Sequence, residues 1–171
     1  MVMDQGTGLP KGLEQLGFGS QFHDTLCRLL EEVAILRDLS RQEIEQIARH
    51  THAYSAHTGV ILFEEGKKSN YICFLVKGQL TVDKERNLTE RRPLTTIRPG
   101  RSVGEMSMID GMPHSATVTT ATDVELIVLT RHGLQRLQEE HPRTAYNVLW
   151  KIAETLSFRL RQTTGQLVDY L

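Results

Sequence analysis

The sequence predicts a mainly β protein: an antiparallel β-roll, or jelly-roll-like barrel, with N-terminal helices and a long C-terminal helix. Between about Ala53 and Leu129, short β-type runs alternate with turn residues. On both sides of this region, apolar residues recur at the spacing of a helix. The chain has 171 residues, which is enough for one domain with a core of useful size.

Residues 1–20 are expected to be a loose tail, because the opening stretch MVMDQGTGLPKG is polar and rich in glycine. Residues 21–52 are predicted to form the N-terminal helices. Ser40 and Glu43 have the spacing of a capping box, which predicts that the second helix begins at Ser40. The apolar face of the first helix is predicted to consist of Phe22, Leu26, Leu29, Leu30 and Val33.

Residues 53–130 are predicted to form the β-roll. Its strands are expected in the runs VILF, YICFLV, QLTV, LTTI, SATVTT and VELIVL. Gly78 separates YICFLV from QLTV and indicates a tight reversal of the chain. Strands this short and regular are typical of small antiparallel barrels and jelly rolls.

Residues 131–171 are predicted to form the C-terminal helices. One helix is expected from His132 to Glu140, and Pro142 suits the first turn of the next. The apolar stripe of this last helix is predicted to contain Ala145, Leu149, Ile152, Leu156 and Leu160. Its far end, with Leu167, Val168, Tyr170 and Leu171, is expected either to pack on the roll, to meet a second copy of the chain, or to cover a bound base.

Composition and charge exclude several classes of function. Lys plus Arg number 20 and Asp plus Glu 21, so a strongly basic surface for DNA is not expected. No run is long enough to span a bilayer, and the start lacks the apolar core of a signal peptide. Cys27 and Cys73 stand outside any CxxC pattern, which favours buried thiols in a reducing compartment. We therefore expect a cytoplasmic protein that binds neither DNA nor a membrane.

The stretch GEMSMIDGMPHSATV, residues 104–118, brings a short helix, a proline corner and a histidine close together. A helix that begins after a glycine exposes unpaired N–H groups and a positive dipole end, which suit an anion. Glu105 would repel a phosphate unless it faced a donor such as a sugar hydroxyl. The pattern therefore predicts a sugar-phosphate site. Two plainer roles stay open: Glu105 as a helix cap, and Ser107 and Ser115 as partners of local backbone groups.

This stretch resembles the phosphate-binding cassette of the cyclic nucleotide-binding domain family. That cassette runs Gly-Glu, a small helix, Gly, a variable residue, Pro, Arg, a small residue, Ala and Thr. Gly104-Glu105, Gly111-Met112-Pro113 and Ser115-Ala116-Thr117 match it. The turn glycines Gly59, Gly66, Gly78 and Gly100 also fall at the family's positions. The resemblance covers roughly Ile35 to the C-terminal end and implies a β-roll that binds cAMP or cGMP.

The resemblance also implies the role of each residue in the cassette. In the family, the glutamate accepts a hydrogen bond from the ribose 2′-hydroxyl, and backbone amides hold the cyclic phosphate. Glu105 is thus the implied ribose contact, and Ser115 and Ala116 complete the implied phosphate pocket. The full set of implied ligand-binding residues is Gly104, Glu105, Met106, Ser107, His114, Ser115 and Ala116.

His114 stands where the family has its arginine. Arginine is a permanent cation with a planar fork, whereas histidine is shorter and largely neutral above about pH 6.5. Loss of a charge-assisted hydrogen bond weakens binding by roughly ten- to a hundredfold. Two interpretations stay open. His114 is a weakened, pH-dependent phosphate contact, with Glu105 as a partner that would raise its pKa, or it fills a site that no longer binds a ligand.

Patterns for metal binding and catalysis are incomplete. His50, His52 and His57 are the densest histidine group, but a cupin-type HxH site also needs a nearby glutamate and an upstream glycine. In the run Gly66–Ser69, Lys67 follows the glycine, but Lys68 stands where a P-loop has Ser or Thr, and no nucleophile elbow is present. We therefore predict no metal site and no enzyme; a metal-dependent cupin-like enzyme is a distant third class.

Because the sequence ends at Leu171, we expect no helix-turn-helix domain after the last helix. We expect a free-standing sensor module for cAMP or cGMP, without its own effector domain. Its partners are expected to be an unknown effector protein and a second copy that packs on the C-terminal helix. The alternative is a degenerate member of the fold that binds no ligand and serves as a protein-interaction module.

Overall fold

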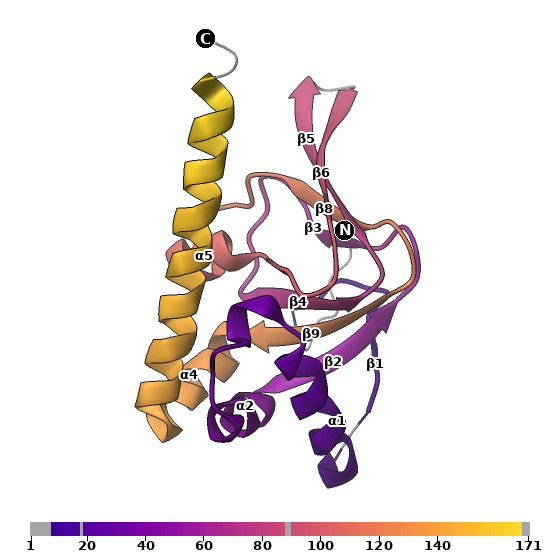
Figure 1. Ribbon diagram of the computed structural model, residues 1–171. Coiled ribbons are helices and arrows are strands. Elements are labelled where there is room, and N and C mark those ends of the chain that lie inside the picture. The colour runs from indigo at the N-terminus through magenta and orange to yellow at the C-terminus, as the bar shows by residue number, and fades with distance from the viewer. Residues whose placement is uncertain (1–7, 18, 88–89, 169–171) are drawn as a thin grey trace.

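The computed structural model describes residues 8–17, 19–87 and 90–168. Two antiparallel sheets face each other, and helices cover the outer side of one of them (Figure 1). The larger sheet has the order β1 (Glu14–Gln15), β2 (Thr51–Ala56), β9 (Val124–Thr130), β4 (Tyr71–Lys77) and β7 (Ser102–Val103). The smaller sheet has the order β3 (Ile61–Phe63), β8 (Thr117–Thr120), β5 (Leu80–Asn87) and β6 (Glu90–Ile97). The predicted antiparallel β-roll is confirmed.

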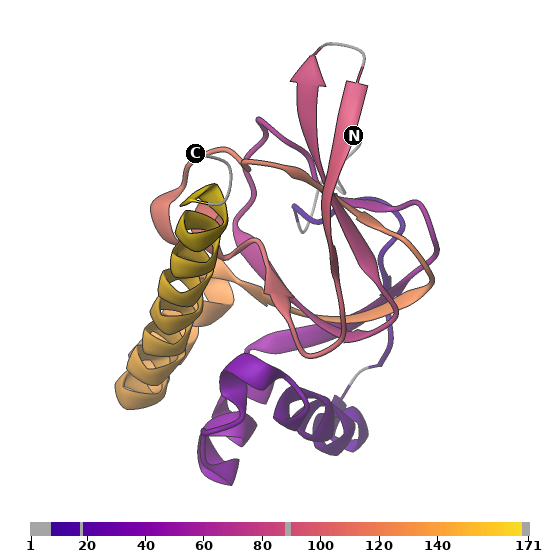
Figure 2. The same cartoon turned by 45° about the horizontal axis from the view of Figure 1, so that its top comes forward.

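The helices lie before, within and after the strands, as Figures 1 and 2 show. The predicted N-terminal helices and the long C-terminal helix are confirmed. The helices are α1 (Gly19–Glu31), the 3-10 turn η1 (Ala34–Leu36), α2 (Arg41–Ala48), α3 (Glu105–Asp110), α4 (Arg131–Glu140) and α5 (Pro142–Val168). The helix α2 begins with the predicted capping box: the Ser40 hydroxyl accepts from the Glu43 N–H, and the Glu43 carboxylate accepts from the Ser40 N–H.

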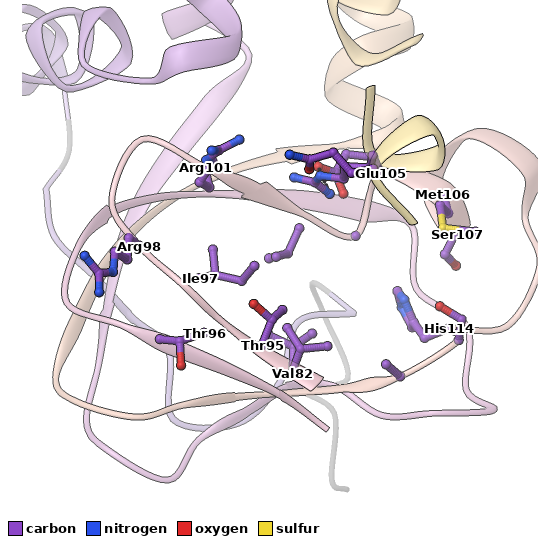
Figure 3. A pocket seen from close by; sticks show the side chains of 17 residues that line it. Val82, Thr95, Thr96, Ile97, Arg98, Arg101, Glu105, Met106, Ser107 and His114 are labelled. Atoms are coloured by element: carbon purple, nitrogen blue, oxygen red, sulfur yellow. Dashed lines mark ion pairs between the residues drawn. The ribbon is translucent and has the colours of Figure 1, made fainter. Parts of the chain in front are cut away.

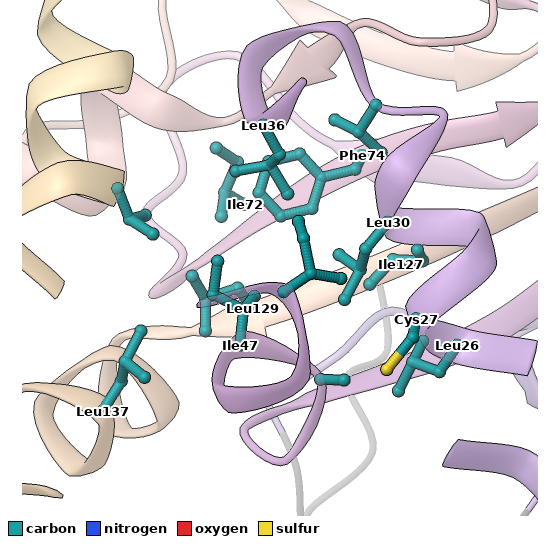
Figure 4. Packing of buried hydrophobic residues seen from close by; sticks show 14 of the residues in the cluster. Leu26, Cys27, Leu30, Leu36, Ile47, Ile72, Phe74, Ile127, Leu129 and Leu137 are labelled. Atoms are coloured by element: carbon teal, nitrogen blue, oxygen red, sulfur yellow. The ribbon is translucent and has the colours of Figure 1, made fainter. Parts of the chain in front are cut away.

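Strands β4 and β9 are almost continuously apolar because both faces of their sheet are covered. Successive side chains of a strand point to opposite faces, so each strand supplies two cores. The inner core, between the sheets, receives Tyr71, Cys73, Leu75, Val124, Leu126 and Val128. The outer core, under the helices, receives Ile72, Phe74, Ile127 and Leu129 (Figure 4). A slip of one residue in either strand would exchange the two sets.

The predicted loose tail is wrong for the part of it that the structure describes. Leu9 is buried in the inner core, and β1 pairs antiparallel with β2 through Glu14 and Ser55. A two-residue strand leaves no periodic pattern in a polar, glycine-rich stretch, so composition alone could not reveal it. Residues 1–7 and 18 lie outside the described ranges.

Gly78 makes the predicted tight turn, which carries the chain from β4 in one sheet to β5 in the other and is not part of a hairpin. It has a φ of 87°, and a Cβ atom there would collide with the backbone oxygen of Asp123, so the turn requires glycine. The hairpin comes one connection later. Strand β5 pairs with β6 from Leu80 opposite Ile97 onward, and this hairpin projects from the roll (Figures 1 and 2).

The predicted apolar stripe of α5 is partly wrong. Leu160 is 68% exposed and Leu149 37%, whereas Val148 and Ile152 are buried in the outer core. The packed face of α5 therefore follows Ala145, Val148, Ile152 and Leu156. The far-end side chains named above, those of Leu167, Val168, Tyr170 and Leu171, lie outside the description. Within the described ranges, no helix combines the length and hydropathy needed to cross a membrane.

Candidate functional site

A cavity of about 460 Å³ opens between α3, the strands β5 and β6, and α5 (Figure 3). All seven residues that the sequence singled out line it: Gly104, Glu105, Met106, Ser107, His114, Ser115 and Ala116. The remaining lining residues carry no site pattern in the sequence; they are Val82, Thr95, Thr96, Ile97, Arg98, Arg101, Val103, Val118, Arg159 and Gln162. The cassette, residues 104–118, therefore forms one wall of an open cavity.

Gly104 makes the sharp entry into α3. Its φ is 91°, in the left-handed region that favours glycine. A Cβ atom at this position would lie 2.6 Å from Phe63 Cζ and 3.0 Å from the Tyr71 carbonyl oxygen. The chain can thus pass against the inner core and aim the first turn of α3 at the cavity only because residue 104 has no side chain.

Glu105 is 2% exposed, and its carboxylate is held by two side chains. The Ser102 hydroxyl donates to Glu105 Oε1 at 2.5 Å, and Arg159 Nη1 lies 3.0 Å from the same oxygen. The other guanidinium nitrogen, Nη2, donates to the Ser102 carbonyl at 2.8 Å. The carboxylate makes no hydrogen bond that caps α3 among the described contacts. Glu105 therefore belongs to a polar network on the cavity wall and not to a helix cap.

Arg159 is the most informative residue that the sequence analysis missed. It comes from α5, and it lies on the face that Ala145, Val148, Ile152 and Leu156 bury. A stripe traced through these four positions reaches residue 159 next, because residues three or four apart share one face of a helix. A charged residue that continues a buried stripe needs a partner. This signal could have identified Arg159, but not Glu105 as its partner.

The His114 ring contacts Ser69 and Phe63, and it makes no ion pair with any described residue. Its Nε2 lies 2.8 Å from Ser69 Oγ, and its ring centroid lies 4.5 Å from that of Phe63. Burial lowers the pKa of the ring, so His114 is neutral at neutral pH. The suggested pairing of His114 with Glu105 is wrong, because that carboxylate is paired with Arg159.

Local hydrogen bonds fix the shape of the cassette. The Ser107 hydroxyl donates to the Met112 carbonyl at 2.7 Å, so its side chain has the plainer local role. The His114 N–H donates to the Lys67 carbonyl at 2.8 Å. At the other end of α3, the Arg131 guanidinium donates to the Met108 carbonyl. The first turn of α3 and residues 115 and 116 line the cavity beside these bonds.

Two further arginines line the end of the cavity opposite His114 (Figure 3). Arg98 and Arg101 flank the Pro99-Gly100 turn between β6 and β7, and neither forms an ion pair with any part of the chain that is described. The turn itself was visible in the sequence, but its position beside the cavity depends on the pairing of β4 with β7. Cation-rich walls of this kind suit a ligand with acceptor groups.

No group of three or more metal-ligating side chains occurs within the described ranges. The histidines considered for a metal site contact different residues. His50 lies beside Glu140, and His57 lies beside Asp123. Both cysteines are free and buried.

Comparisons with known proteins agree with this geometry. A family model described as the cyclic nucleotide-binding domain matches residues 55–141. A solved cyclic nucleotide-binding domain from Methylobacillus flagellatus has a TM-score of 0.80 and 24% identity, covering 94% of this chain and 90% of that one. The fold of the two chains is therefore the same.

Curated relatives show the same family at lower coverage. A CRP-like cAMP-activated global transcriptional regulator from Mycobacterium tuberculosis is 22% identical over 143 residues, which are 84% of this chain and 62% of the relative. A cAMP-dependent protein kinase regulatory subunit from Aspergillus fumigatus is 32% identical over 108 residues, 63% of this chain and 25% of that protein. The chain spans less than two thirds of the length of these relatives. It belongs to the cyclic nucleotide-binding domain family.

Proposed function

We propose that this chain binds a cyclic nucleotide, cAMP or cGMP, in the cavity and acts as a sensor module. Glu105 accepts a hydrogen bond from the ribose 2′-hydroxyl. The backbone N–H groups of the first turn of α3 and of Ser115 and Ala116 receive the cyclic phosphate. Gly104, Met106 and Ser107 shape the wall around it, and His114 lies behind the phosphate as a neutral neighbour.

The observation that carries this proposal is the buried Glu105 carboxylate at the cavity wall. Burial of a carboxylate destabilises a protein unless the group is paired and hydrogen-bonded. Here the Ser102 hydroxyl donates a hydrogen bond to Glu105, and Arg159 forms an ion pair with it. A ribose hydroxyl that donates to Glu105 would enter a network that already includes α5. Ligand would therefore favour one placement of α5 through its differential affinity for that state.

A neutral His114 bonded to Ser69 favours the competing hypothesis, a member of the family that binds no cyclic nucleotide. Calorimetric titration of cAMP and cGMP separates the two. We expect saturable heat with the wild-type chain and tighter binding after His114→Arg. If neither protein gives heat or a thermal shift at millimolar nucleotide, the sensor hypothesis is wrong and the interaction module stands.

The output surface that we propose is the outer face of α5, and its partner is a second copy of the chain. An α5 stripe of Tyr146, Trp150, Ala153, Ser157 and Leu160 recurs at alternating spacings of four and three. This is the spacing of a two-helix seam, in which helices pack along a heptad. Tyr146 is 60% and Trp150 55% exposed, and their rings stack on each other at 6.1 Å. The proposal includes an effector protein and a cytoplasmic location, which the free buried thiols support.

A further inference from the structure

The end of the cavity at His114 lacks a charged donor among the described residues that line it. The lining cations are Arg98, Arg101 and Arg159. Arg98 and Arg101 lie at the far end, and Arg159 is paired with Glu105 (Figure 3). A phosphate seated in the cassette would thus meet backbone N–H groups and a neutral imidazole. Phosphate sites in proteins commonly include a permanent cation as well.

Lys84 lies just outside this end of the cavity. Strand β5 pairs with β8 without a break, with Val82 opposite Val118 and Asp83 opposite Thr117. Side chains alternate along a strand, so Lys84 shares the face of Val82, which lines the cavity. Lys84 therefore continues the cavity wall toward the cassette. Its Nζ donates to the carbonyl of Ser115 at 3.2 Å, and Ser115 itself lines the cavity.

The contacts that hold the Lys84 ammonium are weak enough to exchange. Its ionic partner, Glu65, lies 3.8 Å away, and the lysine side chain is 52% exposed. Ion pairs this long and this exposed contribute little to stability. A lysine also carries its charge on a flexible four-carbon stem with three donors. The Nζ atom can therefore turn from the Ser115 carbonyl to another acceptor at little cost.

We propose that Lys84 supplies the positive charge for the ligand phosphate that position 114 does not supply. This inference rests on the proposed binding of a cyclic nucleotide. In the bound state, Lys84 Nζ donates to a phosphate oxygen, while the N–H groups of Ser115 and Ala116 hold the same phosphate from the cassette. A single ammonium replaces the planar fork of arginine, so it contributes charge without bidentate geometry.

The test is calorimetric titration of cAMP into the wild-type chain, Lys84→Met and Lys77→Met. Lys84→Met keeps the apolar stem and removes the charge. Lys77→Met is the matched control, because Lys77 is an exposed strand lysine with a cross-strand partner, Glu125, away from this cavity. We expect Lys84→Met to weaken binding by about ten- to a hundredfold. The control should change it by less than about twofold.

Further titrations distinguish the loss of a positive charge at Lys84 from a change in the structure of the cavity. Adenosine lacks the phosphate, so its affinity should be the same for wild type and Lys84→Met, and Lys84→Arg should keep the affinity for cAMP. In a His114→Arg background, Lys84→Met should reduce the affinity for cAMP by a several-fold smaller factor than in the wild type. The reason is that the introduced arginine and Lys84 would then bind the same phosphate.

The possible failures differ from each other. If wild type binds cAMP and Lys84→Met behaves like Lys77→Met, the role of Lys84 is refuted while the proposed function stands. Equal losses for cAMP and adenosine would also refute it, since they would show a structural role. If neither cAMP nor cGMP binds the wild type or His114→Arg, both the proposed function and the role of Lys84 are refuted.

Discussion

Arg159 of helix α5 lies 3.0 Å from the buried carboxylate of Glu105 in the cassette. The pair joins the last helix of the chain to the wall of the cavity. A ligand that bonds to Glu105 must share the carboxylate with Arg159 or displace it. In the proposed function, this contact links the position of α5 to the occupancy of the cavity.

Removal of Arg159 should destabilise the protein. Arg159→Met leaves the carboxylate of Glu105 buried with only the Ser102 hydroxyl, and we expect a loss of about 1–3 kcal/mol. This is less than for a fully buried pair, because the Arg159 side chain is one-third exposed. Urea denaturation measures the change. Arg161→Met, two residues farther along α5, is the control, since the Arg161 guanidinium donates to the half-buried Ser157 hydroxyl and pairs with no carboxylate in the described ranges. Equal stability of the two variants would contradict the assigned role of Arg159.

Gly104→Ala should destabilise the protein by about 2 kcal/mol or more, because it combines a strained backbone with a steric clash. Gly59→Ala is a matched control. Gly59 has a φ of 90°, almost the same as 91° at Gly104, but a Cβ atom there meets nothing within 4 Å. The difference between the two free energies of unfolding isolates the clash with Phe63. Equal losses would mean that the cassette does not press on the inner core.

The buried, neutral His114 should make the protein less stable at mildly acidic pH. Burial holds the pKa of His114 below its ordinary value, so the unfolded chain takes up a proton there before the folded chain does. Stability should therefore fall as the pH drops below about 6.5, and His114→Gln should reduce this slope. His50 contributes in the same direction, because burial also lowers its pKa.

Cyclic nucleotide affinity, in contrast, should change by less than about threefold between about pH 6.5 and 8. Burial lowers the pKa of His114, so its ring is predominantly neutral over that range. Calorimetry at several pH values checks this expectation. Affinity that rises steeply toward acid would instead identify a protonated His114 as the phosphate contact, as one interpretation of the sequence held.

Substitution on the α5 stripe should abolish self-association. Trp150→Glu or Leu160→Glu places a charge in the proposed helix seam, and sedimentation should then report the mass of one chain. Phe158→Glu should weaken self-association less, because Phe158 is 52% exposed on the same helix and lines a groove beside Trp150 but lies outside the stripe. A wild-type chain that is monomeric at all concentrations would rule out the second copy as the partner.

The sequence predicted features that depend on short-range patterns. The capping box of Ser40 and Glu43, the strands β4 and β9, and the spacing of the cassette can all be read from neighbouring residues. Helical periodicity placed α5 but put Leu149 and Leu160 on its packed face, since two overlapping stripes fit the same run. Tertiary packing, which chooses between them, is not encoded in local spacing.

The residues that complete the site could not be predicted in the same way. The pairing of Arg159 with Glu105 depends on how α5 crosses the cassette, and the place of Lys84 depends on the register of β5 against β8. The pKa of His114 is lowered by burial, which the sequence left undecided. Each of these properties arises from contacts between segments that are distant along the chain.

Titration of cAMP and of 2′-deoxy-cAMP into the wild-type chain and Glu105→Gln examines the ribose contact itself. We expect wild type to bind cAMP about ten- to a hundredfold more tightly than the deoxy analogue, and Glu105→Gln to lose most of that preference. Equal affinity of the wild-type chain for both nucleotides, or no binding of either, would show that Glu105 does not hold a ribose in this cavity.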